Sequence, residues 1–467
     1  MRGDFSRDTF DPVKHFSRVM QQQGRVHLDA DWNEQTAIVM HYLRTLAADL
    51  IGPFAGPKGD GYGFEIEEVS SEGFSIGRGR YYVDGILCEN EPAAMRYESQ
   101  PDLPFPPELK TGTGYLVYLD VWERHVTSLE DDDIREKALG GPDTATRAKV
   151  VWQVKIGGLE ELEITQASAA AVRRDWPDIV ARLRSPRAGC LRARVDPPKG
   201  STDPCLTSPE SRYRGAENQL YRVEIHRGGP AGEATFKWSR NNASVATRAT
   251  LAGTELTAAD PRGLVAGQWV ELTNDAQELR GTSGRLVKLI KVDGDRLLLE
   301  SPVPVPDDVV EGEEWPTKVR GWDQRKNSAI TLEEGAVPLT ESAEATGWIP
   351  LEDGIQVQFL PSADATGPNV YRAGDYWQIP ARTATGGIEW PTTGEESPQP
   401  LPRSPRGVRH HFAPLATLTA AAGGWTVIDC RTEFPPIKNN VTAISSFGEA
   451  GMGAAAPCVA PVEPVDG

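Results

Sequence analysis

The stretch GYLVYLDVWERHV, residues 114–126, alternates apolar with polar side chains and is rich in β-branched and aromatic residues. The run AKVVWQVKI, residues 148–156, has the same pattern. Because successive side chains of a strand point to opposite faces, both runs predict β-strands. The polar segment between them, TSLEDDDIREKALGGPDTATR at 127–147, predicts a loop that includes a helical turn.

The rest of the chain has the same character. Its 467 residues include 46 glycines and 37 prolines, a density of turn residues that suits many short strands. The run at 74–90 contains Asp84-Gly85, a hairpin-turn signal. We therefore predict a mainly β, multidomain protein with a β-sandwich or barrel body, an N-terminal arm and amphipathic helix, and a small inserted β-barrel.

The division into domains follows from changes of pattern. Alternating runs around Asp293-Gly294 predict the small inserted barrel, and the Gly, Ala and Pro-rich end predicts a tail. The predicted units are an arm and helix at 1–55, a β domain at 56–165, a second β domain at 166–250 and 305–435, the inserted barrel at 251–304, and the tail at 436–467.

The clearest amphipathic helix follows Asp31, which we interpret as an N-cap with Glu34 in the capping-box position. Gly52 and Pro53 predict its end. Its helical periodicity brings these residues near one face: Trp32, Gln35, Val39, Tyr42, Leu43, Leu46 and Leu50.

Charge and hydropathy exclude several partners. The formal net charge of -18 disfavours a nucleic acid or an anionic membrane, since both would repel such a surface. No apolar run is long enough to cross a membrane, and MRGDFSRDTFDP at residues 1–12 lacks the pattern of a signal peptide. We expect cytoplasmic synthesis, with release as part of a larger extracellular particle.

No catalytic, cofactor-binding or metal-binding motif is present. Asp29 and Asp31 have the spacing of an acid/base pair or a calcium clamp, but a helix cap with Asp29 paired to an arginine such as Arg25 is favoured. The run EDDD at 130–133 has calcium binding as its alternative, and a solvated loop is favoured because the turn glycine and closing Glu are missing.

The spacing of the histidines and cysteines does not indicate a metal site or a disulfide framework. His410 and His411 are adjacent, so on a strand they point to opposite faces and do not share a metal. The chain has five cysteines and no CxxC pair. Cys190 and Cys205 flank a turn-rich loop and are the one pair placed to oxidise, but idle thiols are favoured.

A glycan-binding or glycan-degrading module is the alternative function. Twelve tryptophans, several beside polar residues, offer stacking surfaces for sugars, although buried core tryptophans are favoured. Glycosidase chemistry needs two carboxyl groups about 5 to 10 Å apart. The candidates are Asp120, Glu123 and Asp323.

Several segments together resemble an uncharacterised bacterial family whose members begin with a GDFSR-like arm followed by a QQGRVxLDADWNE block. They include GDFSRDTFDPVKHFSRVMQQQGRVHLDADWNEQ at 3–35, RYYVDGILCENE at 80–91, GDYWQIPARTATGGIEWP at 374–391 and HHFAPLA at 410–416. The resemblance extends to about residue 430. It implies a link to phage-tail-like contractile injection systems, and it implies no catalytic residues.

The resemblance implies a structural subunit of such a particle, in a baseplate, spike or fibre. Phage components of this kind commonly clamp neighbouring subunits with an N-terminal arm and helix around a threefold axis. We therefore expect a homo-oligomer, most often a trimer, whose partners are further copies and other particle subunits, with a cell-surface glycan as the alternative partner. The candidate assembly interface comprises Phe5, Phe10, Phe16, Arg25, Asp29, Trp32, Val39, Tyr42, Leu43 and Leu46.

Overall fold

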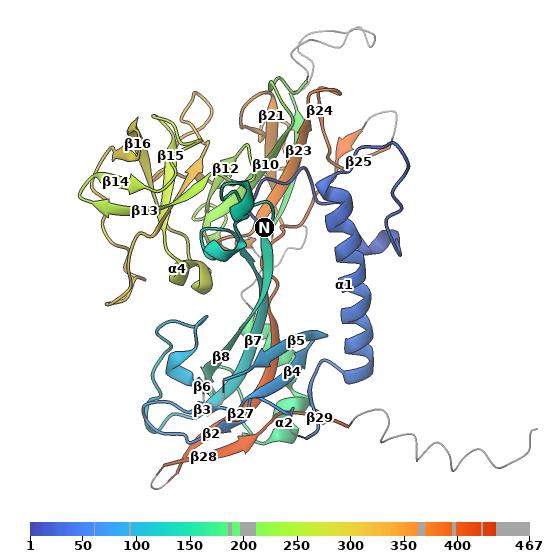
Figure 1. Cartoon of the computed structure of the whole chain (residues 1–467), viewed down its shortest axis with the longest axis vertical. Coiled ribbons are helices and arrows are strands. Elements are labelled where there is room, and N and C mark those ends of the chain that lie inside the picture. The colour runs from blue at the N-terminus through green and yellow to red at the C-terminus, as the bar shows by residue number, and fades with distance from the viewer. Residues whose placement is uncertain are drawn as a thin grey trace, which may run out of the picture.

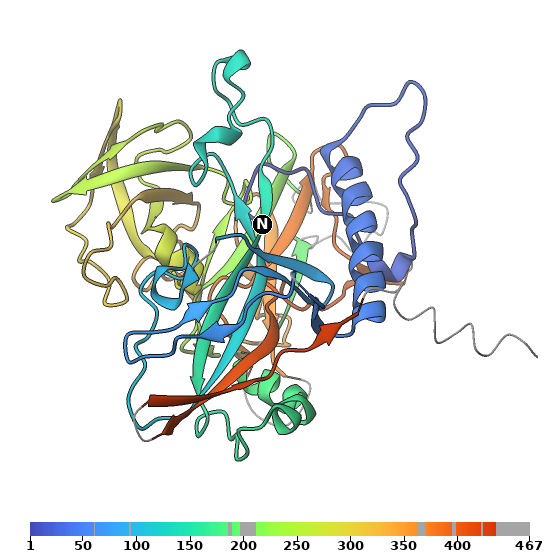
Figure 2. The same ribbon diagram turned by 60° about the horizontal axis from the view of Figure 1, so that its bottom comes forward.

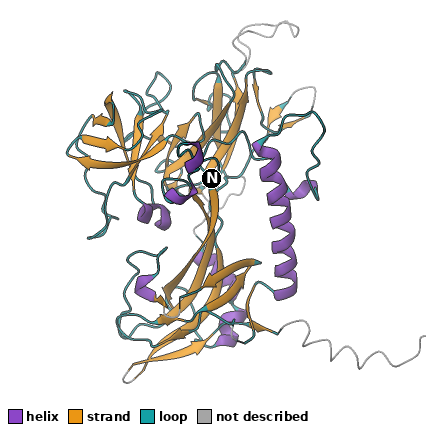
Figure 3. Cartoon of the chain, viewed as in Figure 1, coloured by secondary structure: helices purple, strands orange, loops and turns teal. Residues whose placement is uncertain are grey.

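The computed structural model describes residues 1–59, 61–92, 95–184, 189–196, 212–362, 369–394, 398–421 and 424–435. It is mainly β, as the sequence predicts, with two β bodies, a closed barrel and one long helix along one side (Figures 1 and 3). The predicted tail at 436–467 and Cys205 lie outside the described residues. No helix of the described part is both long and apolar enough to cross a membrane.

The two strands predicted from the opening stretch form the spine of the first β body. They are β7 (Tyr115–Val126) and β8 (Arg147–Gly158), which pair along their whole length from Tyr115↔Gly158 to Val126↔Arg147. The polar loop between them holds two short helical turns, η3 (Asp132–Ile134) and η4 (Lys137–Leu139), as predicted. The sheet is completed by β27 (His411–Ala421), which pairs with β7, and β28 (Gly424–Asp429).

Two smaller sheets and two helices close the first body over one apolar core. The predicted Asp84-Gly85 hairpin joins β4 to β5, and both residues have positive φ (48° and 76°). The sheets are β29 (Glu433–Phe434), β1 (Phe54–Pro57), β4 (Gly79–Val83) and β5 (Ile86–Asn90), then β2 (Ile66–Glu67), β3 (Ser75–Ile76) and β6 (Met95–Arg96) next to η2 (Tyr97–Ser99). The helices are α2 (Ala169–Arg174) and α3 (Trp176–Leu183).

The predicted boundaries of the two β domains need correction here. Residues 166–183 and 411–434 were assigned to the second domain, yet Trp176 and Leu418 lie in the core of the first. The C-terminal strand β27 returns to pair with β7, for instance at Ala413↔Leu119. Local alternation predicts that a segment is a strand, but its pairing partner is decided by long-range packing.

The second β body is built around β10 (Gln219–Arg227). Its core gathers large side chains from both of its main sheets, including Phe236, Trp238, Phe359 and Trp377. The first main sheet contains β10, β12 (Thr235–Ser239), β19 (Val337–Pro338), β23 (Tyr376–Arg382) and β24 (Gly387–Ile388). The second contains β9 (Cys190–Val195), β20 (Ile349–Pro350) and β21 (Ile355–Leu360). Two two-stranded sheets accompany them, β11 (Gly229–Pro230) with β22 (Val370–Tyr371) and β25 (Thr392–Thr393) with β26 (Gln399–Pro400).

The inserted module is a closed six-stranded barrel that is larger than the predicted 251–304. Its Asp293-Gly294 hairpin is where the sequence places it. The strand β18 pairs with both β13 and β15, so without it these two would be open edges. The barrel contains β13 (Ala246–Ala252), β14 (Glu255–Ala258), β17 (Arg296–Leu299), β16 (Arg285–Asp293), β15 (Trp269–Thr273) and β18 (Lys318–Trp322), with α4 (Asp275–Arg280) after β15.

The long helix α1 (Asp29–Ile51) stands along the side of both β bodies (Figures 1 and 2). It ends at Gly52 with φ 92°, as predicted. The predicted N-cap Asp31 is wrong, because the cap residue is Leu28, three residues earlier, and its side chain makes no capping hydrogen bond. Before it, the arm contains one short turn, η1 (Pro12–Lys14).

Candidate assembly interface

The helix α1 faces the body with the large apolar side chain of Ile38 and otherwise with small and polar side chains. Ala30 and Ile38 are its buried residues. The Arg44 guanidinium donates two hydrogen bonds, of 2.9 and 2.8 Å, to the Glu123 carboxylate on β7, and these hold the pKa of Glu123 below its usual value. The carbonyl oxygen of Arg44 also lies against the hairpin turn at Gly85. The docking of α1 thus depends on an ion pair and a close backbone contact.

The opposite face of α1 is apolar and exposed. At ~100° per residue, Trp32, Val39, Leu43, Leu46 and Leu50 lie within about 40° of one line along the helix, and Tyr42 flanks them. The predicted grouping on one face is therefore confirmed, and this face is the outer one. The exposed fractions are 76% for Trp32, 45% for Val39, 52% for Tyr42, 55% for Leu43, 57% for Leu46 and 65% for Leu50.

The first eleven residues, the inner arm, pack on their own chain. Gly3 is buried and its N–H donates to the Asn242 carbonyl at 3.3 Å. Phe5 packs edge-on against His125, with ring centroids 5.9 Å apart, and Phe10 lies 5.8 Å from the ring of His41. These two members of the predicted interface have partners within the chain. Their assignment to an interface with a neighbouring subunit is therefore not supported, because both rings contact the chain itself.

Arg2 fixes the inner arm to a buried ionic network. Its guanidinium lies 2.6 Å from Glu224 on β10 and 3.4 Å from Glu278 on α4, so it joins the second body to the barrel. Lys237 completes the network, 3.4 Å from Glu224 and 2.6 Å from Glu271. Burial opposes ionisation of Glu224, but the nearby cations, Arg2 first, hold its pKa well below the usual value.

Residues 12–28, the outer arm, stand away from the body beside α1 (Figure 2). The Val19 N–H donates to Gln35 at 2.8 Å and links the segment to α1. Every other residue of the outer arm is largely exposed. The large apolar side chains among them are Val13 (76% exposed), Phe16 (54%), Met20 (72%), Val26 (81%) and Leu28 (42%).

Asp29 and Arg25 do not form the expected ion pair among the described contacts. Asp29 accepts a hydrogen bond of 2.9 Å from the Ser6 N–H. Burial acts to raise the pKa of Asp29, but the bonds from Ser6 outweigh it and lower that pKa. Arg25 is exposed on the outer arm. Of the predicted interface, Phe16, Arg25, Trp32, Val39, Tyr42, Leu43 and Leu46 therefore remain available to a partner.

The three carboxyl groups considered for sugar chemistry are each held by different cations. Asp120 is buried and lies 2.7 Å from both His410 and Lys155. Glu123 is held by Arg44, and Asp323 lies 3.6 Å from Arg240. These contacts account for all three carboxylates within the fold.

One carboxyl group with a raised pKa, Glu352, was not singled out from the sequence. Burial raises the pKa of Glu352 to about 7, against the opposing charge of Arg240 at 2.7 Å. Asp323, Asp353 and the Tyr221 hydroxyl stand around it. The sequence gives no sign of this group, because its members come from four separate segments of the chain.

Two further predictions about side chains can be compared with the structure. His410 contacts Asp120 and His411 contacts Asp84, so the adjacent histidines have different partners. In the EDDD loop, Asp131 accepts a hydrogen bond from the Asp133 N–H and Asp132 pairs with Arg135 at 2.8 Å, as in a solvated loop. Glu130 differs from the prediction, because its side chain is only 8% exposed and contacts Lys318.

One group of carboxylates among the described residues has the spacing of a metal site. The carboxylate oxygens of Glu130, Asp275 and Glu278 lie within 4.8 Å of one another. The Lys318 ammonium contacts all three, at 2.5 Å from Asp275 and 2.9 Å from Glu278. A lysine side chain therefore neutralises the charge that a cation would otherwise balance.

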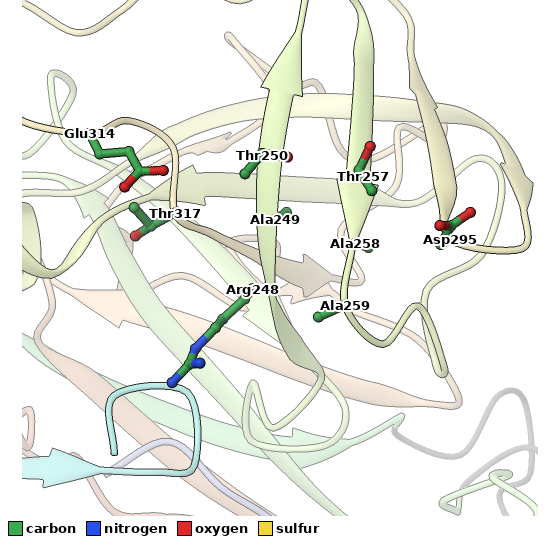
Figure 4. A pocket seen from close by; sticks show the side chains of 9 residues that line it. All are labelled: Arg248, Ala249, Thr250, Thr257, Ala258, Ala259, Asp295, Glu314 and Thr317. Carbon is green, nitrogen blue, oxygen red and sulfur yellow. The ribbon is translucent and has the colours of Figure 1, made fainter. Parts of the chain in front are cut away.

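Two hollows open on the surface. One, of about 540 Å³, lies on the barrel at the paired strands β13 and β14, and its walls carry alanines, threonines, Arg248, Asp295 and Glu314 (Figure 4). The other, of about 500 Å³, lies between the inner arm and the second body. The barrel hollow has no aromatic side chain in its lining, and Trp32 on α1 is the one tryptophan of the chain with a largely exposed side chain.

Comparison with known proteins gives one match. The model of a family of unknown function, DUF6519, matches residues 1–178 and 165–445. No curated protein and no solved structure matches the chain.

Proposed function

The chain belongs to the DUF6519 family of unknown function, and we propose that it is a structural subunit of a phage-tail-like contractile injection particle, assembled through the outer arm and the outer face of α1. The observation that carries this proposal is the orientation of α1. Its buried face holds one large apolar side chain, Ile38, beside small and polar ones, whereas Trp32, Val39, Leu43, Leu46 and Leu50 are exposed on the outer face. A helix that served only its own chain would bury the apolar face.

The size of the exposed surface supports an assembly role. Burying one large aliphatic side chain stabilises a protein by about 1.5–3 kcal/mol. The outer arm and α1 together leave eleven large apolar side chains more than 40% exposed, namely Val13, Phe16, Met20, Val26, Leu28, Trp32, Val39, Tyr42, Leu43, Leu46 and Leu50. So many exposed large apolar side chains in two neighbouring segments are typical of a protein–protein interface.

The attachment of this surface to the body supports a mechanical role. Arg2 locks the inner arm into the ionic network, and Arg44 fixes α1 to β7. The interface is thus held at both ends by buried or partly buried ion pairs. A neighbour bound to the outer arm or α1 is then coupled to the β bodies.

The assignment to a contractile particle rests on the resemblance of the arm and the block at 3–35 to proteins linked with such systems. The charge of the chain supports this assignment. At a net charge of -18, copies of the chain repel each other over most of their surface, and the uncharged outer face of α1 is a place where they can approach. The carboxylates considered for sugar chemistry are held by cations, so the structural role is the one we propose.

The first test is the mass of the purified full chain in solution, by light scattering during size-exclusion chromatography. We expect an oligomer, with a trimer as the commonest form of such subunits. A matched variant that changes Val13, Phe16, Met20 and Val26 to serine should weaken assembly while the β bodies stay folded. Truncating the whole arm is a poor test, because it also removes Arg2, one of the cations that contact Glu224 and Glu278, and so perturbs the fold. A monomeric full chain at micromolar concentration contradicts self-assembly.

The second test addresses the particle. Sedimentable contractile particles from producing cells, analysed by mass spectrometry, should contain this chain in fixed proportion to the tube and sheath subunits. Particles that assemble without it contradict the particle role and leave self-assembly standing.

A further inference from the structure

The exposed apolar residues of α1 follow the spacing of a coiled coil. Trp32, Thr36, Val39, Leu43, Leu46 and Leu50 are separated by four, three, four, three and four residues, which is the alternation of d and a positions in a heptad repeat. We call these six residues the seam. All six are exposed, and they run along nearly the full length of the helix from Asp29 to Ile51.

The residues that flank the seam are almost free of charge. At the neighbouring e and g positions stand Asn33, Gln35, Met40, Tyr42, Ala47 and Asp49, so a single acidic group borders the seam. In a chain of net charge -18, most surfaces of two copies repel each other. The seam is a surface on which two copies of this chain can meet without that repulsion.

We infer that the seam is occupied by the same helix of further copies, as a parallel coiled coil around the symmetry axis of a ring. This inference rests on the proposed self-assembly and names the partner of that surface. The spacing of large side chains along α1 fits a helix that carries the same spacing. In a cyclic ring of three or more copies, helices that meet around the axis run in the same direction.

The alternative partner for the seam is a segment of the same chain, residues 436–467. It has no heptad repeat and is rich in Gly, Ala and Pro, so its sequence does not match the seam. A second copy of α1 is therefore the partner to which we commit.

The first experiment compares two variants by light scattering. Leu43→Glu/Leu46→Glu places charges in the seam, and Thr45→Glu places one at an exposed position of the same helix outside it. We expect the double variant to fall to the monomer mass and the control to keep the oligomer mass. Unchanged far-ultraviolet circular dichroism establishes that the β bodies stay folded. An oligomer that survives in the double variant overturns the inference.

The second experiment reads the register. In a parallel, in-register coiled coil, residue 43 of one copy faces residue 43 of the next at a distance that suits a disulfide. Mild oxidation of Leu43→Cys should give covalent dimers on a non-reducing gel, while Thr45→Cys and the unmodified chain, with its own five cysteines, give the background.

The outcomes separate the inference from the proposed function. An oligomeric full chain without a cross-link at residue 43 overturns the inference and leaves self-assembly standing. A monomeric full chain contradicts both. If the Leu43→Cys thiol of that monomer reacts only after removal of 436–467, the seam belongs to this segment and the inference is wrong.

Discussion

The carbonyl oxygen of Arg44 in α1 lies 2.1 Å from the place where a Cβ on Gly85 would stand. No side chain fits at this contact, and the glycine also has φ 76°. The hairpin turn at Asp84-Gly85 therefore touches the helix backbone directly. This contact and the Arg44–Glu123 ion pair set the position of α1, and hence the direction in which its apolar face points.

Gly85→Ala should loosen the docking of α1. The left-handed conformation costs an alanine about 1–2 kcal/mol, and the overlap with Arg44 adds roughly 1–3 kcal/mol. The matched control is Gly294→Ala, at the second Asp-Gly hairpin, where φ is 59° but nothing lies within 4 Å of the added Cβ. Trypsin cleavage after Arg44 should become faster in the first variant and stay unchanged in the second. Equal cleavage rates would contradict the contact.

Arg2→Ala should destabilise the protein, because it removes one of three cations around buried Glu224. Arg222 at 2.5 Å and Lys237 at 3.4 Å still contact this carboxylate, so we expect a loss of about 1–3 kcal/mol and not the full cost of an unpaired buried charge. The control is Arg7→Ala, which breaks the ion pair between Arg7 and Glu389. Both side chains of this pair are more than a third exposed, so its loss should cost about 1 kcal/mol or less. Urea unfolding midpoints measure the difference. Similar midpoints for the two variants would show that the network tolerates the loss of Arg2.

Features of the fold that depend on neighbouring residues were predictable from the sequence. The alternation at 114–126 predicted β7, and Gly52 predicted the end of α1. Both Asp-Gly pairs predicted their hairpins. In each case the physical cause lies within a few residues of the signal.

Features that depend on distant residues were not predictable. The return of β27 to β7 joins segments about 300 residues apart, and the barrel needs β18 to close. The sequence grouped the apolar residues of α1 on one face but gave no direction for it. That direction depends on the ion pair between Arg44 and Glu123, which are 79 residues apart in the chain.

Glu352 should make stability depend on pH between about 4.5 and 7. Its folded pKa is raised to about 7, so below the unfolded value near 4.5 both states are protonated and the folded state pays no penalty. As the pH rises toward 7, the unfolded state releases this proton first and the protein becomes less stable. Glu352→Gln should remove this decline and raise the melting temperature at pH 8 relative to the wild type.

The control for this prediction is Glu334→Gln, whose side chain is 77% exposed. Its melting temperature should follow that of the wild type from pH 5 to pH 8. A Glu352→Gln curve parallel to the wild-type curve would contradict the raised pKa.

Lys318→Ala should convert the group of Glu130, Asp275 and Glu278 into a site that responds to cations. The lysine ammonium now contacts all three carboxylates, and burial is outweighed by these charges, so the pKa of Lys318 is raised. Without it, Arg124 still contacts Asp275 and Glu278, but Glu130 loses Lys318 and the three carboxylates, whose oxygens lie within 4.8 Å, gain net negative charge, which suits Ca²⁺. Millimolar Ca²⁺ should therefore raise the melting temperature of the variant and leave that of the wild type unchanged.

Lys291→Ala, which removes an exposed lysine from its ion pair with Asp293, is the control and should show no calcium response. A calcium response in the wild type would mean that the ammonium does not fill the site.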